Sequence, residues 1–367
     1  MANYTYKSFT DNAKNISARE LVSAPLWSGN SFSLYNVYTS SEQSDTQKRY
    51  FYEVYNTQSY IQGSESQFSL TYGDYVGSGS STGSYNVPDY DYPTKAIYSQ
   101  YKRLLLNSGV DLFEFPYNDG TIQTSEYIYV VNVNRSRFKD RMDTNTWQLS
   151  LAKLTGNGSA SIASHADIIT LIDDSGTSTT ALAQQGGRVY SVRSGSLKNG
   201  LYTGSYANTP WGLFYPDNGV IVLNGKALDA SASYYTSRSY VPTVSQNTYT
   251  GSMWGDNSAY RFFNSVSGAI AYSPTTHSFQ GRTSEVVSSA YYFVRIYSNE
   301  YNYTTNSSFL DSNYKIKFQR MREDPKVYIT TIGLYDDSGN LLAIAKLSKP
   351  IQKSFDREVI IKVKLDY

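Results

Sequence analysis

The sequence predicts a mainly β protein, built of antiparallel sheets in several sandwich-like domains with one or two short helices. Short runs rich in β-branched and aromatic residues recur along the 367 residues, separated by clusters of Gly, Ser, Asn and Asp that are typical of turns. Tyrosine, which favours strands, occurs 37 times. Segments in which apolar residues follow the helical period are few.

Several strands are predicted before residue 320. Residues 126–133 are apolar on both faces, as buried strands are. Residues 146–154 alternate apolar with polar or small side chains, which predicts a half-exposed strand. The strands over residues 211–215 and 220–223 flank Pro216-Asp217-Asn218-Gly219, a strong hairpin signal. The remaining predicted strands cover residues 50–55, 168–172, 188–193, 291–297 and 315–318.

The C-terminal residues 326–367 predict a three-stranded meander. Residues 327–335 and 341–347 flank a turn cluster, and Pro350 then interrupts the pairing because proline lacks a backbone N–H. From residue 359 onward every second residue is apolar. The face expected to be core carries Val359, Ile361, Val363, Leu365 and Tyr367.

One helix is well supported, from residue 93 to about residue 106. Pro93 suits the first helical position, and Gly109 can terminate the helix. Its predicted apolar face consists of Ile97, Tyr101, Leu104 and Leu105. Weaker candidates cover residues 134–142 and 258–266.

Changes in composition predict three regions. The first is an N-terminal β-rich region with the helix (1–155), the second a middle β region (156–285) and the third a C-terminal meander region (286–367). The middle region could instead be an insertion, with the outer two sharing a sheet. Residues 64–92 and 231–251 are rich in Ser, Gly, Thr and Tyr and are expected to be surface loops.

Composition also argues against several functions. Lys and Arg (32) nearly balance Asp and Glu (31) without a basic block, so nucleic acid is not an expected partner. Cysteine is absent, which fits folding in a reducing cytoplasm. No secretory signal and no run of 18 apolar residues is found, so membrane insertion is not expected.

No arrangement of residues predicts an enzyme. His165 and His277 are the only histidines and lie far apart, which argues against a metal site. Ser81 lies in a G-x-S-x-G match, but no strand precedes it and no helix follows directly, as a nucleophile elbow requires. The pairs Asp173-Asp174 and Asp336-Asp337 are interpreted as turns. No catalytic, cofactor-binding or metal-binding residue is therefore predicted.

Two tyrosine-rich loops are the candidate functional segments. Their rings could pin the loops onto their own domain, become buried against a neighbouring subunit, or stack on a glycan. The high tyrosine content favours a protein rich in interfaces. The candidate interface residues are Tyr72, Tyr75, Tyr85, Tyr90, Tyr92, Tyr234, Tyr235, Tyr240 and Tyr249.

Several segments resemble a known family. Residues 324–335 (DPKVYITTIGLY) and 341–351 (LLAIAKLSKPI) are similar to the C-terminal end of virion structural proteins of contractile-tailed phages, especially those that infect cyanobacteria. Residues 49–55, 93–101 and 212–219 are similar to other parts of these proteins. The resemblance implies a tail or baseplate protein and brings no catalytic motif with it.

From this resemblance we expect a baseplate wedge protein of a myovirus such as a cyanophage, without enzymatic activity or cofactor. The residue types indicate that it would assemble through its tyrosine-rich loops and exposed strand edges. It would be assembled in the bacterial cytoplasm and located in the virion tail. Its expected partners are other tail and baseplate proteins, in a multi-copy and six-fold arrangement. The alternatives are a peripheral host-receptor (glycan) binding or fibre-attachment protein, and a neck or collar protein; a cell-wall hydrolase is the weakest.

Overall fold

The computed structural model describes residues 16–39, 51–58, 62–77, 93–153, 168–177, 182–203, 207–232, 258–272, 277–304 and 306–367. The chain divides into two compact units, which we call unit 1 (Met1–Leu21 and Val286–Tyr367) and unit 2 (Val22–Glu285). Strands predominate in the described residues and their pairs are antiparallel, which confirms the predicted mainly β class.

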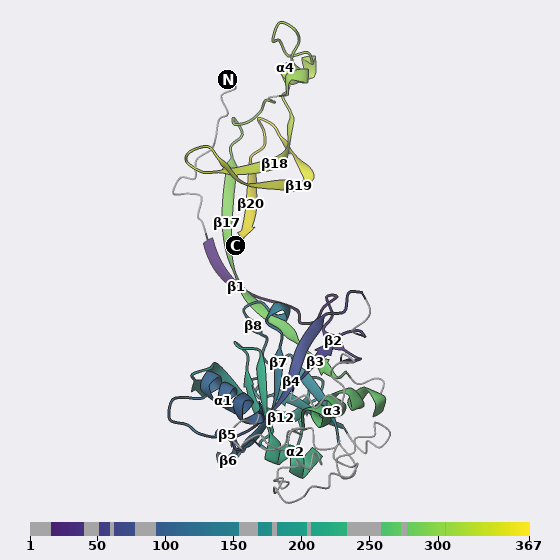
Figure 1. Cartoon of the computed structure of the whole chain (residues 1–367). Coiled ribbons are helices and arrows are strands. Elements are labelled where there is room, and N and C mark those ends of the chain that lie inside the picture. The colour runs from purple at the N-terminus through teal and green to yellow at the C-terminus, as the bar shows by residue number, and fades with distance from the viewer. Residues whose placement is uncertain are drawn as a thin grey trace, which may run out of the picture. The chain divides into compact units, whose positions relative to one another are not determined.

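Unit 2 is built on a twelve-stranded sheet (Figure 1). Its main path follows the order β2 (Ser33–Leu34), β16 (Phe279–Gln280), β9 (Gln148–Ala152), β10 (Ile168–Asp173), β12 (Gly187–Ser196), β14 (Gly212–Tyr215), β15 (Val220–Asn224), β7 (Tyr127–Val133), β4 (Ser66–Asp74) and β3 (Phe51–Tyr55). Two short strands, β11 (Leu182–Gln184) and β13 (Gly200–Leu201), also pair with β12.

Both faces of this sheet are covered, so its central strands are apolar on both sides. In β7, Ile128 and Val130 belong to one buried cluster, with α1 (Pro93–Leu105) and the hairpin of β5 (Phe113–Pro116) and β6 (Ile122–Ser125). The alternate residues Tyr129 and Val131 belong to a second cluster on the other face. The helices α2 (Gly225–Ala232) and α3 (Ser258–Tyr272) contribute to that second cluster (Figure 1).

Several local predictions are confirmed. The hairpin β14–β15 pairs Tyr215 with Val220 around the predicted turn, in which Gly219 has a φ of 67°. The predicted helix from residue 93 matches α1, although Leu104 is exposed instead of sharing the buried face. The weak helix prediction at residues 258–266 matches the first part of α3, and α2 was not predicted.

Other local predictions are wrong. Residues 66–74, assigned to a surface loop, form the buried strand β4, and residues 134–142 form a short 3₁₀ turn followed by β8 (Arg141–Met142) instead of a helix. Strand β9 is buried on both faces and not half-exposed, since Ser150 is as inaccessible as Leu149. The predicted strand at residues 315–318 is only a bridge from Ile316 to Leu310, followed by α4 (Gln319–Glu323).

The boundary predicted near residue 155 does not separate units, because β9 and β10 pair directly in the large sheet. The predicted start of the C-terminal region, residue 286, coincides with the start of the second segment of unit 1. The four-stranded sheet has the order β1 (Ile16–Pro25), β17 (Arg282–Ile296) and β20 (Val359–Asp366), with β8 also pairing with β17.

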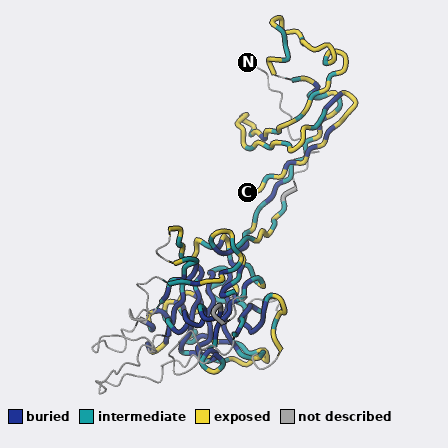
Figure 2. Tube along the Cα trace, turned by 90° about the vertical axis from the view of Figure 1, so that its right-hand side faces the viewer, coloured by how far each residue is buried: buried dark blue, intermediate teal, exposed yellow. Residues whose placement is uncertain are grey.

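In unit 1 the predicted meander is wrong in its last step. Strands β18 (Val327–Tyr335) and β19 (Leu341–Lys353) form a two-stranded sheet, but β20 pairs with β17, placing Val363 beside Tyr292. The pairing does break near Pro350, because the register passes from Ile329↔Ile351 to Thr331↔Lys346. The alternation predicted for β20 is confirmed through Val363, while Tyr367 is exposed (Figure 2).

Candidate functional site

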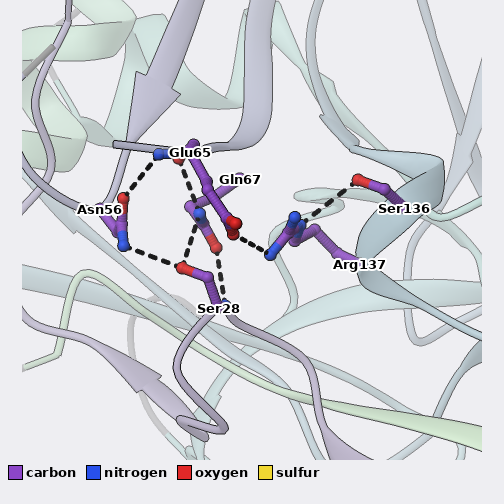
Figure 3. Close-up of polar contacts among 6 residues, drawn as sticks. All are labelled: Ser28, Asn56, Glu65, Gln67, Ser136 and Arg137. Atoms are coloured by element: carbon purple, nitrogen blue, oxygen red, sulfur yellow. Dashed lines mark hydrogen bonds and ion pairs between the residues drawn. The ribbon is translucent and has the colours of Figure 1, made fainter. Parts of the chain in front are cut away.

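A cluster of hydrogen-bonded polar side chains in unit 2 stabilises the fold. Gln67 is fully buried, and its amide donates to Ser28 Oγ (2.9 Å) and to the carbonyl oxygen of Glu65 (2.7 Å). Its Oε1 accepts from the backbone N–H of Ser28 at 3.0 Å. Asn56 donates to Ser28 and Arg137 donates to Glu65, which completes a network between loops and strand ends (Figure 3). These hydrogen bonds satisfy one another, so the cluster has a structural role.

In the carboxylate pair Asp173-Asp174, Asp173 is the last residue of β10 and pairs with Val192, so the predicted turn begins only at Asp174. Asp173 is almost fully buried and accepts hydrogen bonds from the backbone N–H groups of Asn145 and Ser175 at 3.0 Å. Asp174 accepts from the backbone N–H of Ser191, also at 3.0 Å. Burial raises the pKa of both carboxyl groups, and nearby Arg193 partly offsets this effect on the pKa of Asp174. The acceptors are occupied by backbone donors, so this pair holds strand ends together.

The part of the chain that the structure describes contains no group of three or more His, Cys, Asp or Glu able to hold a metal ion. His277 packs edge-on against Tyr35, with ring centroids 4.5 Å apart, and burial lowers its pKa. His165 and Ser81 lie outside the described residues. No described helix has the length and apolar character needed to cross a membrane.

Of the nine candidate interface tyrosines, two fall in described segments. Tyr72 is a core residue of β4, 1 % exposed, with its ring 5.0 Å from that of Tyr129, so its assignment to a surface loop is wrong. Tyr75 is 43 % exposed and packs edge-on against Tyr98. The remaining candidates lie outside the described residues: Tyr85, Tyr90, Tyr92, Tyr234, Tyr235, Tyr240 and Tyr249.

The sequence reasoning missed an apolar surface on the β18–β19 hairpin of unit 1. One set of its side chains, including Leu334 and Ala343, packs against the cluster that contains Ile361 and Val363. A second set is exposed to solvent, and we call it the hairpin patch. The patch consists of Tyr335, Leu341, Leu342 and Ile344.

The residues of the hairpin patch lie close together because of the strand register. Ile344 pairs with Gly333, and Tyr335 pairs with Leu341. A Cβ at Gly333 would lie 2.7 Å from the ring of Tyr335 and 3.2 Å from Leu341. The side chains of Tyr335 and Leu341 therefore both lie over Gly333. Leu342 and Ile344 remain 69 % and 67 % exposed. A continuous apolar surface of this kind favours contact with another macromolecule.

Unit 1 also has an open cavity of about 340 Å³. Its lining residues are Tyr301, Tyr303, Thr304, Phe309, Met321, Lys326, Val327, Tyr328 and Ile329. Tyr303 and Tyr328 are more than half exposed, and Thr304 and Lys326 supply polar groups. Tyr301 adopts a φ of 52°, a conformation that is uncommon for a bulky residue and occurs at functional or strained sites. The cavity has the composition of a site for a sugar ring or for a partner's side chain.

Comparisons with protein-family models, with curated proteins and with solved structures gave no match for this chain.

Proposed function

We propose that this protein is a structural component of a tailed-phage virion, and specifically a baseplate wedge protein of a contractile tail. It acts by assembly, without catalysing a reaction. Its partners are other tail and baseplate proteins in a multi-copy, six-fold arrangement. It binds neither nucleic acid nor membrane and reaches its place in the tail after assembly in the host cytoplasm.

The observation that carries the proposal is the hairpin patch. The segments that resemble the C-terminal end of the phage proteins, residues 324–335 and 341–351, cover β18 and most of β19. Each apolar square ångström removed from water contributes about 25 cal/mol, so covering Leu342 and Ile344 with a neighbouring subunit stabilises an assembly. The hairpin has apolar residues on both faces. One face can then pack against the core of its own unit while the other contacts a partner subunit.

The polar chemistry of the described residues agrees with a structural role. Buried acceptors such as Asp173 bind backbone donors, and Gln67 is satisfied by its neighbours. Hydrogen-bonding capacity used in this way stabilises one geometry of the surrounding backbone.

A second candidate function, binding of a host-surface glycan, is favoured by the cavity beside β18. The aromatic rings of Tyr303 and Tyr328 offer stacking faces, and Thr304 and Lys326 offer hydrogen-bonding groups. Binding of host polysaccharide by the purified chain, abolished by Tyr328→Ala, would support this function over the wedge function.

Location in the particle tests the main proposal. Antibodies against the purified chain, visualised with gold on intact virions by electron microscopy, are expected to label the distal end of the tail around its axis. Label on the head, at the fibre tips or nowhere on the particle would contradict a baseplate position.

Replacing two residues of the patch is expected to prevent incorporation without unfolding the protein. Leu342→Ser with Ile344→Thr removes exposed apolar surface, so the free energy of unfolding should change by no more than about 0.5 kcal/mol per site. The amount of protein per purified particle, measured by quantitative mass spectrometry, should fall at least about tenfold, because about 1.4 kcal/mol of lost contact energy corresponds to that factor.

The matched control is Leu104→Ser with Ile122→Thr in unit 2, two apolar residues that are 47 % and 57 % exposed. This control should be incorporated at the level of the unmodified protein. Equal incorporation of both double variants would show that the hairpin patch is not an assembly surface.

A further inference from the structure

Unit 1 contains a lysine whose side chain is fully buried. Lys353, the last residue of β19, has no exposed surface. Its Nζ donates to the carbonyl oxygen of Ser298 (2.8 Å), to Oδ1 of Asn302 (2.9 Å) and to the carbonyl oxygen of Ser354 (2.9 Å). All three of these acceptors are neutral oxygens.

A buried ammonium group whose hydrogen-bond acceptors are neutral oxygens is costly, because these hydrogen bonds replace only part of its hydration. Burial accordingly lowers the pKa of Lys353, while the negative charges of Glu300 and Glu358 partly offset the effect. The lowered pKa increases the fraction of neutral amine, which is the nucleophilic form of lysine.

The side chain of Asn302 is held beside this amine. Asn302 is 9 % exposed, and its Nδ2 donates to the carbonyl oxygen of Ser298 at 2.7 Å. That hydrogen bond orients the amide so that Oδ1 accepts from Lys353 Nζ. Ser298 O therefore binds both the amine and the amide nitrogen, which keeps the two reacting groups side by side. Two reacting groups that are held together in this way have a high effective concentration, which speeds the reaction between them.

We propose that Lys353 and Asn302 form an intramolecular isopeptide bond that joins the end of β19 to the segment after β17. The lone pair of Nζ attacks Cγ of Asn302, the Cγ–Nδ2 bond breaks, and the amide nitrogen leaves as ammonia. Lys353 starts as an ammonium and loses two protons, one to free the lone pair of Nζ and one as the new C–N bond forms. Both protons pass to the leaving nitrogen, which they convert first to ammonia and then to ammonium. The reaction needs neither oxidant nor co-reactant, and it replaces a buried charge with a neutral amide.

Glu300 is the group that we assign to carry the proton from the lysine to the leaving nitrogen. It lies two residues before Asn302, on the turn whose Ser298 carbonyl oxygen accepts a hydrogen bond from Lys353 Nζ. Its carboxylate accepts from the backbone N–H of Tyr297 at 2.9 Å, which holds it on the same turn. Glu358 is engaged by Arg295 at 2.7 Å and is less suited to this role.

The bond would serve a protein under mechanical load, although the inference does not depend on the proposed function. It closes a loop between residues 302 and 353, so that pulling on the chain would have to break a covalent bond before β18 and β19 could be extracted. A cross-link of this length also restricts the unfolded chain, as a disulfide does, without requiring an oxidising compartment.

Peptide mapping of the purified full chain tests the inference. Trypsin should release residues 296–315 covalently joined to residues 347–357, because a modified Lys353 resists cleavage and the bond after Lys349 precedes proline. The mass of the joined peptide should be the sum of the two peptides less one ammonia, about 17 Da. Recovery of free 296–315 and of a peptide ending at Lys353 as the only products would overturn the proposal.

Three variants test the roles of Lys353, Asn302 and Glu300 separately. Lys353→Met should give no joined peptide, which distinguishes the bond from a succinimide formed by Asn302 alone. Asn302→Asp should give a joined peptide that has lost water, about 18 Da, in place of ammonia. Glu300→Gln should slow joining at least about tenfold in freshly synthesised protein, within the range found for loss of a general acid or base. Joining at an unchanged rate in Glu300→Gln would overturn the assignment of the proton carrier.

Discussion

Val363→Asp is expected to unfold unit 1 while unit 2 stays folded. Val363 is 7 % exposed and lies in the cluster formed by β17, β20 and the inner face of the β18–β19 hairpin. The substitution removes a buried apolar side chain and introduces an unpaired carboxylate, for which we expect a loss of about 3 kcal/mol or more. The two clusters of unit 2 contain no residue of unit 1, so the loss should not spread to them.

Limited proteolysis with mass mapping measures this outcome. In Val363→Asp the first cleavages should fall within residues 286–367, and a fragment of unit 2 should persist. Deletion of residues 358–367 should have the same effect, because it removes Val359, Ile361 and Val363 together.

Ile360→Asp is the matched control for Val363→Asp. Ile360 lies in the same strand but is 65 % exposed, on the face opposite the cluster. Both substitutions replace a β-branched residue with Asp, so they share the loss of strand propensity. If Ile360→Asp destabilised unit 1 as much as Val363→Asp, the position of the core assigned to β20 would be wrong.

The alternation of β20 was predictable from sequence, but its pairing partner was not. A strand with one buried face repeats every two residues, and residues 359–366 keep that period. Neighbouring antiparallel strands usually pair in sequence order, which favoured β19 as the partner. The structure instead pairs β20 with β17, more than sixty residues earlier, and no local signal in either strand encodes that choice.

Composition was misleading at β4. Its glycine, serine and tyrosine resemble those of the loop that was predicted there. A Cβ at Gly73 would lie 2.9 Å from the backbone nitrogen of Tyr98, so this glycine lets α1 pack closely on the strand. Tyr72 faces the opposite cluster, which contains Tyr129. A glycine required by helix–sheet packing and one required by a turn are identical in sequence.

The hairpin patch was missed for a related reason. Leu342 and Ile344 alternate with Ala343 and Ala345, so every position in this part of β19 is apolar. Such a run is expected for a strand buried on both faces, as β15 is. Only the arrangement of the small unit shows that one face of the hairpin meets the core and that the other meets solvent.

Trp147→Ala is expected to have the largest effect of a single substitution in unit 2. Trp147 is fully buried next to β9, with ring centroids 5.1 Å from Phe214 in β14 and 6.3 Å from Phe279 in β16. Truncation to Ala leaves a cavity among three strands and should lower the free energy of unfolding by about 3–5 kcal/mol. Its indole N–H has no hydrogen-bond partner among the described residues, so the loss is one of packing. The free energy of unfolding is measured by denaturant titration, and hydrogen exchange shows which amides lose protection. Trp147→Phe is expected to lower the free energy of unfolding by less than Trp147→Ala. Leu104→Ala, at an exposed site, should change it by no more than about 0.5 kcal/mol.

Trp147→Ala and Val363→Asp together test whether the two units fold independently. Trp147 and Val363 belong to clusters that share no residue, so each variant should lower the protection of amides in its own unit and leave the other unit unchanged. Distant sites without shared partners are expected to contribute additively, so the double variant should show both losses and no more. Loss of protection in both units from either single variant would show that they unfold as one cooperative body despite their separate cores.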